Sequence, residues 1–298
     1  MRDFVGHAGQ PPDVTWPNGG RLALVVVLNL EEGAEPSIAD GDSATELALT
    51  DGIPGEVPAG TRDLVAESLF EYGARAGVWR ILREAAARDL PLTLSACGRA
   101  LERNPPLAAA IRAAPRHEVA AHGYGFRRHW QLSEDAQRAE IARAVASLEA
   151  TTGRRPQGWQ SRYSPTIHTR RLLREAGGFL YDADFYADDL PCWTRVDGAP
   201  HLMVPHSFLH NDNRYASGKV QTADDFLALL GGAFRILHAE SRRMTRMMVV
   251  SLHARLSGHP ARFDALRRFL DLVDAAPEVW RCTRLDLARH WIAQVPPP

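Results

Sequence analysis

The run from Leu22 to Leu28 is continuously apolar and shows no polar alternation. A strand with this pattern is buried on both faces, as in a parallel sheet that helices cover. The apolar stretch ends at Leu30, and two adjacent carboxylates, Glu31 and Glu32, follow it directly. In parallel α/β proteins the catalytic groups come from the carboxyl ends of the strands. The run therefore predicts a parallel α/β fold and marks the two glutamates as candidate catalytic residues.

Strand patterns and helix patterns alternate along the rest of the chain. Apolar runs indicate further strands at residues 92–96, 118–121, 158–162, 179–182, 201–207 and 247–252. Helical spacing and capping residues indicate helices at 77–90, 105–114, 133–153, 169–176, 222–237, 263–273 and 283–292. A chain of this length suggests roughly two domains, but α/β barrels of this size fold as one. We expect a single domain over residues 1–298, a closed or nearly closed barrel of about seven parallel strands with outer helices.

Two stretches lack any hydrophobic period. Residues 1–20 carry several prolines and glycines and predict an irregular N-terminal arm. Residues 33–67 predict a long loop, since glycine and proline recur through them. Loops of this length in compact domains are usually lids, binding loops or oligomer arms.

The composition limits the partners. The chain is 45% hydrophobic with a net charge of −1, so it lacks the basic excess typical of nucleic-acid binding, and a small-molecule substrate is expected. There is neither the apolar core of a signal peptide nor the run of about 18 apolar residues that a membrane span needs, so we expect a cytoplasmic protein without membrane contact. Cys97, Cys192 and Cys282 are widely spaced, so they are predicted to be small core residues rather than disulfide or zinc ligands.

Ionisable residues stand at the ends of several predicted strands, as Glu31 does. They are His122, Arg162, Asp182, Asp184 and His253. In a barrel these ends converge on one face. A carboxylate that accepts a proton, a histidine that donates one and a cation that stabilises an oxyanion suffice to hydrolyse an amide with water. No Gly-x-Ser-x-Gly elbow occurs, cysteine catalysis has no signal beyond Cys97, and a metal needs three well-placed ligands.

Three short motifs at these strand ends are recognisable. Leu30-Glu31-Glu32-Gly33, Ala121-His122-Gly123 and Ser251-Leu252-His253 resemble the first, second and last motifs of the polysaccharide deacetylase (NodB-homology) superfamily, whose fold is a distorted (β/α) barrel. Residues 2–6, 67–77, 169–173, 177–182 and 188–191 resemble its cofactor-independent allantoinase branch. That resemblance covers nearly the whole chain. It implies opening of the hydantoin ring of allantoin, a step of purine catabolism, without a metal. It also implies a homo-oligomer and suggests a tetramer.

The metal motifs of the superfamily are incomplete here. Metal-dependent deacetylases carry Asp-Asp in the first motif and His-x-x-x-His in the second, whereas Phe126 stands four residues after His122. Only Glu32 and His122 remain at ligand-like positions. We therefore expect no cofactor, with zinc or another divalent metal on these two residues as the alternative. Gln160 and His259 stand where the relatives usually carry arginine.

The residues and the resemblance lead to one functional prediction, a metal-independent hydrolase of a carbon–nitrogen bond in a small cyclic ureide or imide, allantoin first. Glu31 or Glu32 is expected to activate water as general base, with the pKa of one raised by its neighbour. His122 is expected to position the substrate or donate a proton to the leaving nitrogen, and His253 and Arg162 to stabilise charge on the carbonyl oxygen. The predicted substrate-binding residues are Arg162, Phe126, Trp159, Asp184, Asn211, Asp212 and Arg255. The alternatives are a metal-dependent deacetylase of acetylated sugars and a non-catalytic small-molecule-binding barrel.

Overall fold

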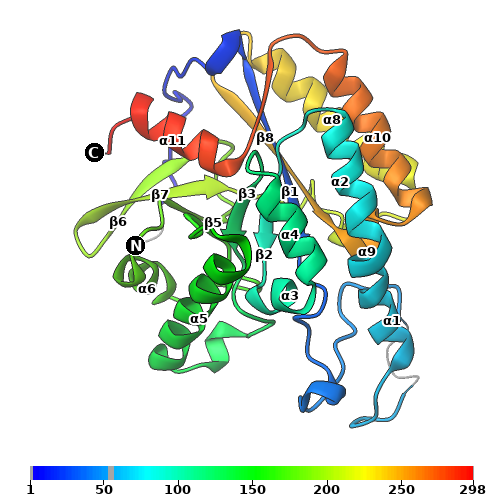
Figure 1. The fold of residues 1–298 in the computed structure, drawn as a ribbon. Coiled ribbons are helices and arrows are strands. Elements are labelled where there is room, and N and C mark those ends of the chain that lie inside the picture. The colour runs from blue at the N-terminus through cyan, green and yellow to red at the C-terminus, as the bar shows by residue number, and fades with distance from the viewer. Residues whose placement is uncertain (1–2, 53–56, 298) are drawn as a thin grey trace.

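The computed structural model describes residues 3–52 and 57–297, and its centre is one strongly curved sheet (Figure 1). The strand order is β6-β7-β5-β4-β3-β2-β1-β8, and β9 also pairs with β1. The strands are β1 (Leu22–Leu30), β2 (Thr93–Ala96), β3 (Glu118–Ala121), β4 (Gly158–Trp159), β5 (Tyr181–Phe185), β6 (Cys192–Val196), β7 (Ala199–Pro205), β8 (Arg246–His253) and β9 (Val279–Cys282). All pairings are parallel except β6 with β7. The fold is the expected distorted (β/α) barrel.

Helices follow most of the strands and cover the outer side of the sheet (Figure 1). The α-helices are α1 (Leu64–Tyr72), α2 (Val78–Ala87), α3 (Gly98–Arg103), α4 (Pro105–Ala113), α5 (Glu134–Thr152), α6 (Thr169–Ala176), α7 (Asn213–Ala216), α8 (Ala223–Glu240), α9 (Ala254–Ser257), α10 (Pro260–Asp274) and α11 (Arg284–Gln294). Short helical turns are η1 (Pro17–Gly19), η2 (Ile38–Asp40), η3 (Gly73–Gly77) and η4 (His129–Gln131). No helix among the described residues is long and apolar enough to span a membrane.

The seven predicted strands are present, and the structure adds β6 and β9 within the described residues. β6 runs antiparallel to β7 through a two-residue turn at Asp197 and Gly198. The barrel is not closed by continuous pairing, since β6 and β8 lie at opposite ends of the strand order. A single bridge between Asn211 and Ser251 brings the chain after β7 against β8.

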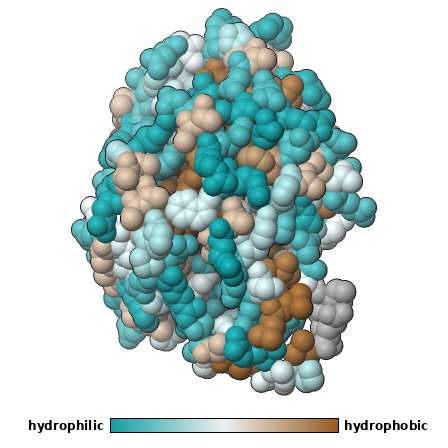
Figure 2. Space-filling view, turned by 45° about the vertical axis from the view of Figure 1, so that its right-hand side comes forward, coloured by the Kyte–Doolittle hydropathy of each residue, from teal (hydrophilic) through white to brown (hydrophobic). Residues whose placement is uncertain are grey.

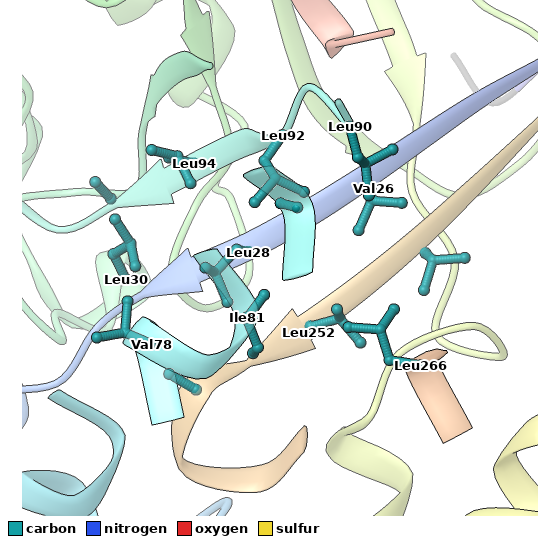
Figure 3. Close-up of a cluster of buried hydrophobic side chains, with 14 of the residues drawn as sticks. Val26, Leu28, Leu30, Val78, Ile81, Leu90, Leu92, Leu94, Leu252 and Leu266 are labelled. Carbon is teal, nitrogen blue, oxygen red and sulfur yellow. The ribbon is translucent and has the colours of Figure 1, made fainter. Parts of the chain in front are cut away.

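Strand β1 is buried along its whole length, as its apolar run predicts. Leu24, Val26 and Leu28 belong to a large core shared with β2, β8, α2 and α10. Figure 3 shows Val26 and Leu28 within it. Val25 and Val27 point inward to a second core, which the indole of Trp291 in α11 joins. The alternation of side chains along a strand explains the two cores. The N-terminal arm also packs here, because Trp16 is buried and its indole N–H donates to Arg246 O at 2.9 Å.

The loop predicted at residues 33–67 ends earlier than expected, and residues 53–56 of it lie outside the described part of the chain. Helix α1 begins at Leu64, continues through the π-helical turn η3 and runs directly into α2, so the prediction of loop to 67 and helix from 77 is wrong at both bounds. Gly77 at the end of η3 is needed for close packing, since a Cβ there would lie 2.1 Å from Ala254 O and a Cβ on Gly258 would lie 2.4 Å from Gly77 Cα.

The surface is mostly hydrophilic on the side drawn in Figure 2, where hydrophobic residues gather near one edge. Among the large apolar side chains that remain exposed, Trp130, Tyr186 and Phe208 lie at the mouth of a cavity described below.

Candidate active site

The alternation of β1 separates the two adjacent glutamates. Val27 faces the inner core and Leu30 the outer core. By the same alternation the side chain of Glu31 points inward and that of Glu32 points outward. Glu31 therefore lies inside the barrel mouth, while Glu32 Oε1 accepts a hydrogen bond from the Arg255 backbone N–H at 3.1 Å and packs against Gly73.

Glu31 is buried among four groups that carry or can carry positive charge. Its Oε1 lies 2.9 Å from Arg162 Nε, 3.1 Å from His122 Nε2 and 3.7 Å from His253 Nε2, and its Oε2 lies 2.8 Å from Arg255 Nη1. Burial acts to raise the pKa of Glu31, but Arg162 and Arg255 with the two imidazoles hold it well below its usual range. The sequence predicted a raised pKa for one of the pair, and for Glu31 the structure gives the opposite direction.

His253 is oriented by a buried carboxylate. Its Nδ1 lies 2.7 Å from Asp212 Oδ1, and Asp212 Oδ2 accepts the backbone N–H groups of His253 and Ser257 at 2.8 and 3.2 Å. With Nδ1–H held by Asp212, Nε2 faces the barrel mouth. Burial disfavours the charged ring, yet the charges of Glu31 and Asp212 outweigh it and raise the pKa of His253 above its ordinary value.

His122 is fixed through both ring nitrogens. Nδ1 lies 2.7 Å from the Gln160 carbonyl oxygen, so it donates to that oxygen, and Nε2 faces Glu31. Burial lowers the pKa of His122, against the opposing effect of Glu31. The ring thus links the end of β3 to the loop after β4.

These side chains form the floor of a cavity of about 590 Å³, within the usual range for small-molecule sites. Its polar floor includes Asn29, Glu31, His122, Gln160, Arg162, Asn211 and His253, and its walls include Trp130, Tyr163, Tyr186, His206 and Phe208. Phe208 stacks on Tyr186 with ring centroids 4.6 Å apart. Arg162 Nη2 is buried here without a hydrogen-bond acceptor among the described residues, which leaves a charged donor for a ligand.

Three predicted substrate-binding residues support the cavity from behind. Phe126 packs under the Arg162 guanidinium, 3.6 Å from the ring centroid. Trp159 is fully buried, and its indole N–H donates to Ser161 Oγ at 3.1 Å. Asp184 accepts the Ser161 N–H and hydroxyl at 2.8 and 2.7 Å, which fixes the loop that carries Arg162.

Of the other predicted residues, Asn211 lines the cavity. Asp212 lies behind His253, and Arg255 bridges Glu31 and Glu32. Burial, with the nearby Asp182 charge, raises the pKa of Asp184 to about 7. Of all the predicted site residues, five line the cavity itself: Glu31, His122, Arg162, Asn211 and His253.

A buried arginine below the floor was missed. Arg284, the first residue of α11, donates to Gln160 Oε1 and to His206 Nδ1, each at 2.7 Å. An arginine only donates, so His206 Nδ1 accepts from Arg284, and His206 Nε2 lies 3.3 Å from Asn211 Nδ2. His206 ends the predicted strand at 201–207, so the strand-end rule could have found it, whereas nothing in the sequence marks Arg284.

A second cavity lies on the other side of the glutamate pair and has a volume of about 670 Å³. Glu32 and Glu35 line it. Glu35 accepts the Gly33 N–H at 2.6 Å, and burial is the main cause that raises the pKa of Glu35 to about 7. Glu35 is a residue that the sequence did not single out.

The donor set at the cavity floor does not fit a catalytic metal. A zinc site needs three protein ligands around one point. Phe126 replaces the second histidine of the motif, and Arg162 and Arg255 place two guanidinium cations against Glu31. Among the described residues, the only group of three His, Cys, Asp or Glu side chains with mutually close ligand atoms is His7, Asp188 and Cys192, outside this cavity.

Comparison with known proteins gives consistent matches. The protein family described as "Polysaccharide deacetylase" matches residues 60–178 of the chain. A Schizosaccharomyces pombe protein named for the same family is 31% identical over 99% of this chain and 98% of its own length. The crystal structure of Puue allantoinase superposes with a TM-score of 0.95, 41% identity and coverage of 100% of this chain and 99% of that one. A Pseudomonas aeruginosa PAO1 structure named as a polysaccharide deacetylase gives a TM-score of 0.94 at 38% identity, covering 99% of both chains.

Proposed function

The chain belongs to the polysaccharide deacetylase family, and from that premise we propose that it opens an amide bond in a small cyclic ureide or imide, with allantoin as the reference substrate. The family and its neighbours indicate a hydrolase that acts on carbon–nitrogen bonds. The full-length similarity to Puue allantoinase supports a cyclic ureide as the substrate class. The predictions of no cofactor and of a homo-oligomer, with a tetramer as the assembly that the resemblance suggests, belong to the same proposal.

One observation carries the proposed chemistry, the Asp212–His253 pair that faces a cavity floored by Arg162. A histidine backed by a carboxylate, with its pKa raised above the ordinary value, is suited to accept and return a proton. In our proposal His253 Nε2 takes a proton from water as the water oxygen attacks the ring carbonyl. Arg162 stabilises the oxyanion that forms. The carbon–nitrogen bond then breaks, and His253 returns the proton to the leaving nitrogen.

In this proposal Glu31 is not the general base that the sequence predicted. Because Arg162 and Arg255 hold its pKa well below the usual range, Glu31 is a weak base and stays ionised. Its charge keeps the two guanidinium groups and His253 in place. Glu32 is assigned a supporting role, since it bonds to Arg255 and does not line the 590 Å³ cavity.

The cavity walls favour a substrate that carries an apolar group. Trp130, Tyr186 and Phe208 remain 54%, 46% and 61% exposed at the mouth, and Tyr163 continues the same wall. Flat apolar side chains of this kind bind aromatic or aliphatic substituents through contact area and stacking. We therefore propose hydantoins and cyclic imides with an apolar substituent as substrates beside allantoin, whose own ureido substituent is polar.

A substrate panel tests the proposal. Purified protein is incubated with allantoin, 5-phenylhydantoin, succinimide and a chitooligosaccharide, with and without a chelator, and products are measured by mass spectrometry. We expect ring opening that the chelator leaves unchanged, and its loss in a His253→Gln variant. Release of acetate from the chitooligosaccharide, abolished by the chelator, would instead establish the metal-dependent deacetylase. Thermal shifts from these compounds with no product would favour the non-catalytic barrel.

A further inference from the structure

Two chain segments that are distant in sequence, the N-terminal arm and the stretch from Asp188 to Cys192, meet beside the β5–β6 connection. His7 comes from the N-terminal arm, Asp188 from the connection itself and Cys192 from the first residue of β6. One possible ligand atom from each lies within 4.8 Å of the other two, and all three residues are half-buried. None of them lines the cavity of the proposed active site.

The spacing of the side chains suits one ion. His7 Nε2 and Cys192 Sγ are 3.4 Å apart. A tetrahedral zinc ion with bond lengths of about 2.0 Å to nitrogen and 2.3 Å to sulfur separates two such ligands by about 3.5 Å. The carboxylate of Asp188 supplies the oxygen donor. Its Oδ1 accepts the Leu190 N–H at 3.1 Å, and its Oδ2 lies on the side of Gly6.

The surrounding structure presents the imidazole toward this point. Asp3 Oδ1 accepts the N–H groups of Val5 and Gly6 at 2.8 and 3.3 Å, which forms a turn immediately before His7. The His7 ring packs against the Trp291 indole with centroids 6.3 Å apart. The ligand is therefore held on a folded arm, and little ordering remains to be done when a metal binds.

We propose that His7, Asp188 and Cys192 bind a Zn²⁺ ion, with water as the fourth ligand, and that this ion ties the N-terminal arm to the β5–β6 connection. A set of one thiolate, one imidazole and one carboxylate matches zinc, whereas Ca²⁺ and Mg²⁺ require oxygen ligands. On binding, the Cys192 thiol releases its proton to solvent and the thiolate coordinates the metal. The site is structural and separate from the proposed catalytic cavity.

The ion would lie close along the chain to one residue of the cavity wall. Tyr186, which forms part of the cavity wall, is two residues before Asp188 on the same connection. A bound ion restrains this connection between the end of β5 and the start of β6. Zinc should therefore raise thermal stability, because a ligand that binds only the folded state stabilises it.

Cobalt substitution tests the site on the full chain. The protein is stripped with chelator, dialysed against Zn²⁺ or Co²⁺, and measured by elemental analysis and absorption spectroscopy. We expect one equivalent of metal, a thiolate-to-cobalt charge-transfer band and a zinc-dependent rise in melting temperature. Cys192→Ser should abolish the band, and Asp188→Asn, a change of nearly equal size, should weaken zinc binding at least tenfold.

The matched control is His122→Ala, which alters the proposed catalytic floor and should retain the full equivalent of zinc and the band. The proposal is overturned if the wild type binds no metal, if Cys192→Ser retains it, or if His122→Ala loses it. These readouts need no turnover, so they stand or fall independently of the proposed function. Because wild-type protein would carry zinc at this site, a test for a metal at the proposed catalytic site must measure zinc in the Cys192→Ser variant.

Discussion

Replacing Glu31 by glutamine separates two assignments of the base. Glu31 Oε1 lies 3.7 Å from His253 Nε2, and two unit charges about 4 Å apart interact by about 4 kcal/mol at an effective dielectric constant near 20. That energy equals about three pKa units. Glu31→Gln removes this attraction and leaves Arg162 and Arg255 near the ring, so the pKa of His253 must fall. We expect a decrease of about one to three units, since solvent and the remaining charges screen part of the interaction.

The pH profile of kcat/KM measures this shift. In the free enzyme His253 must be neutral to accept a proton, so the rate rises with pH through its folded-state pKa. In the wild type that midpoint lies above the ordinary histidine value, because the pKa is raised. In Glu31→Gln the acid limb should move to lower pH, and the plateau should fall because a weaker base transfers the proton less readily.

Glu35→Gln is the matched control, since Glu35 lines the other cavity and should leave the acid limb in place. Folding must be checked by circular dichroism, because removing one partner of a buried ion pair typically costs about 3–5 kcal/mol. A folded Glu31→Gln variant whose rate falls about 100-fold or more at every pH, with an unmoved midpoint, would refute our reasoning and restore Glu31 as the base.

Three further predictions follow from single contacts. Asp212→Asn should lower kcat by about 100-fold or more, because the amide no longer holds His253 in its proton-accepting tautomer; steady-state assays of the folded variant check this. Phe208→Ala should raise KM for 5-phenylhydantoin more than for allantoin if the aromatic wall binds the substituent, which parallel kinetics on both substrates can disprove. Gly73→Ala places a Cβ 2.6 Å from Glu32 Oε1, so urea denaturation should show a loss of about 1–3 kcal/mol.

Much of the fold follows from patterns that depend on nearby residues. Continuous apolar runs end at polar strand ends, and these ends bring Glu31, His122, Arg162 and His253 together, as the sequence predicts. The same two-residue period also separates Glu31 from Glu32, and applying it would have assigned the inward glutamate in advance. The turn at Asp197 and Gly198, where both residues have positive φ, carries the Asp-Gly signature of a tight hairpin and could have located β6.

Other features depend on contacts that no local pattern encodes. Arg284 reaches the cavity floor from a helix near the end of the chain, where a charged residue would ordinarily be assigned to the surface. The direction of the Glu31 pKa depends on how many cationic groups face it, and these come from the ends of three other strands, β3, β4 and β8. The close packing of the π-helical turn against the backbone at Ala254 and Gly258 depends on a distance that only the folded chain sets.

The contact between Gly77 and Gly258 restricts how this protein can diverge. Elsewhere in the core a larger side chain can be accommodated when a neighbour becomes smaller, so pairs of positions exchange volume over time. Here the opposing atoms belong to the main chain, so no substitution of a side chain can make room for a larger residue. The helix and the corner that carries His253 and Arg255 must therefore keep one separation in every descendant of this sequence, even where the cavity walls change to fit a new substrate.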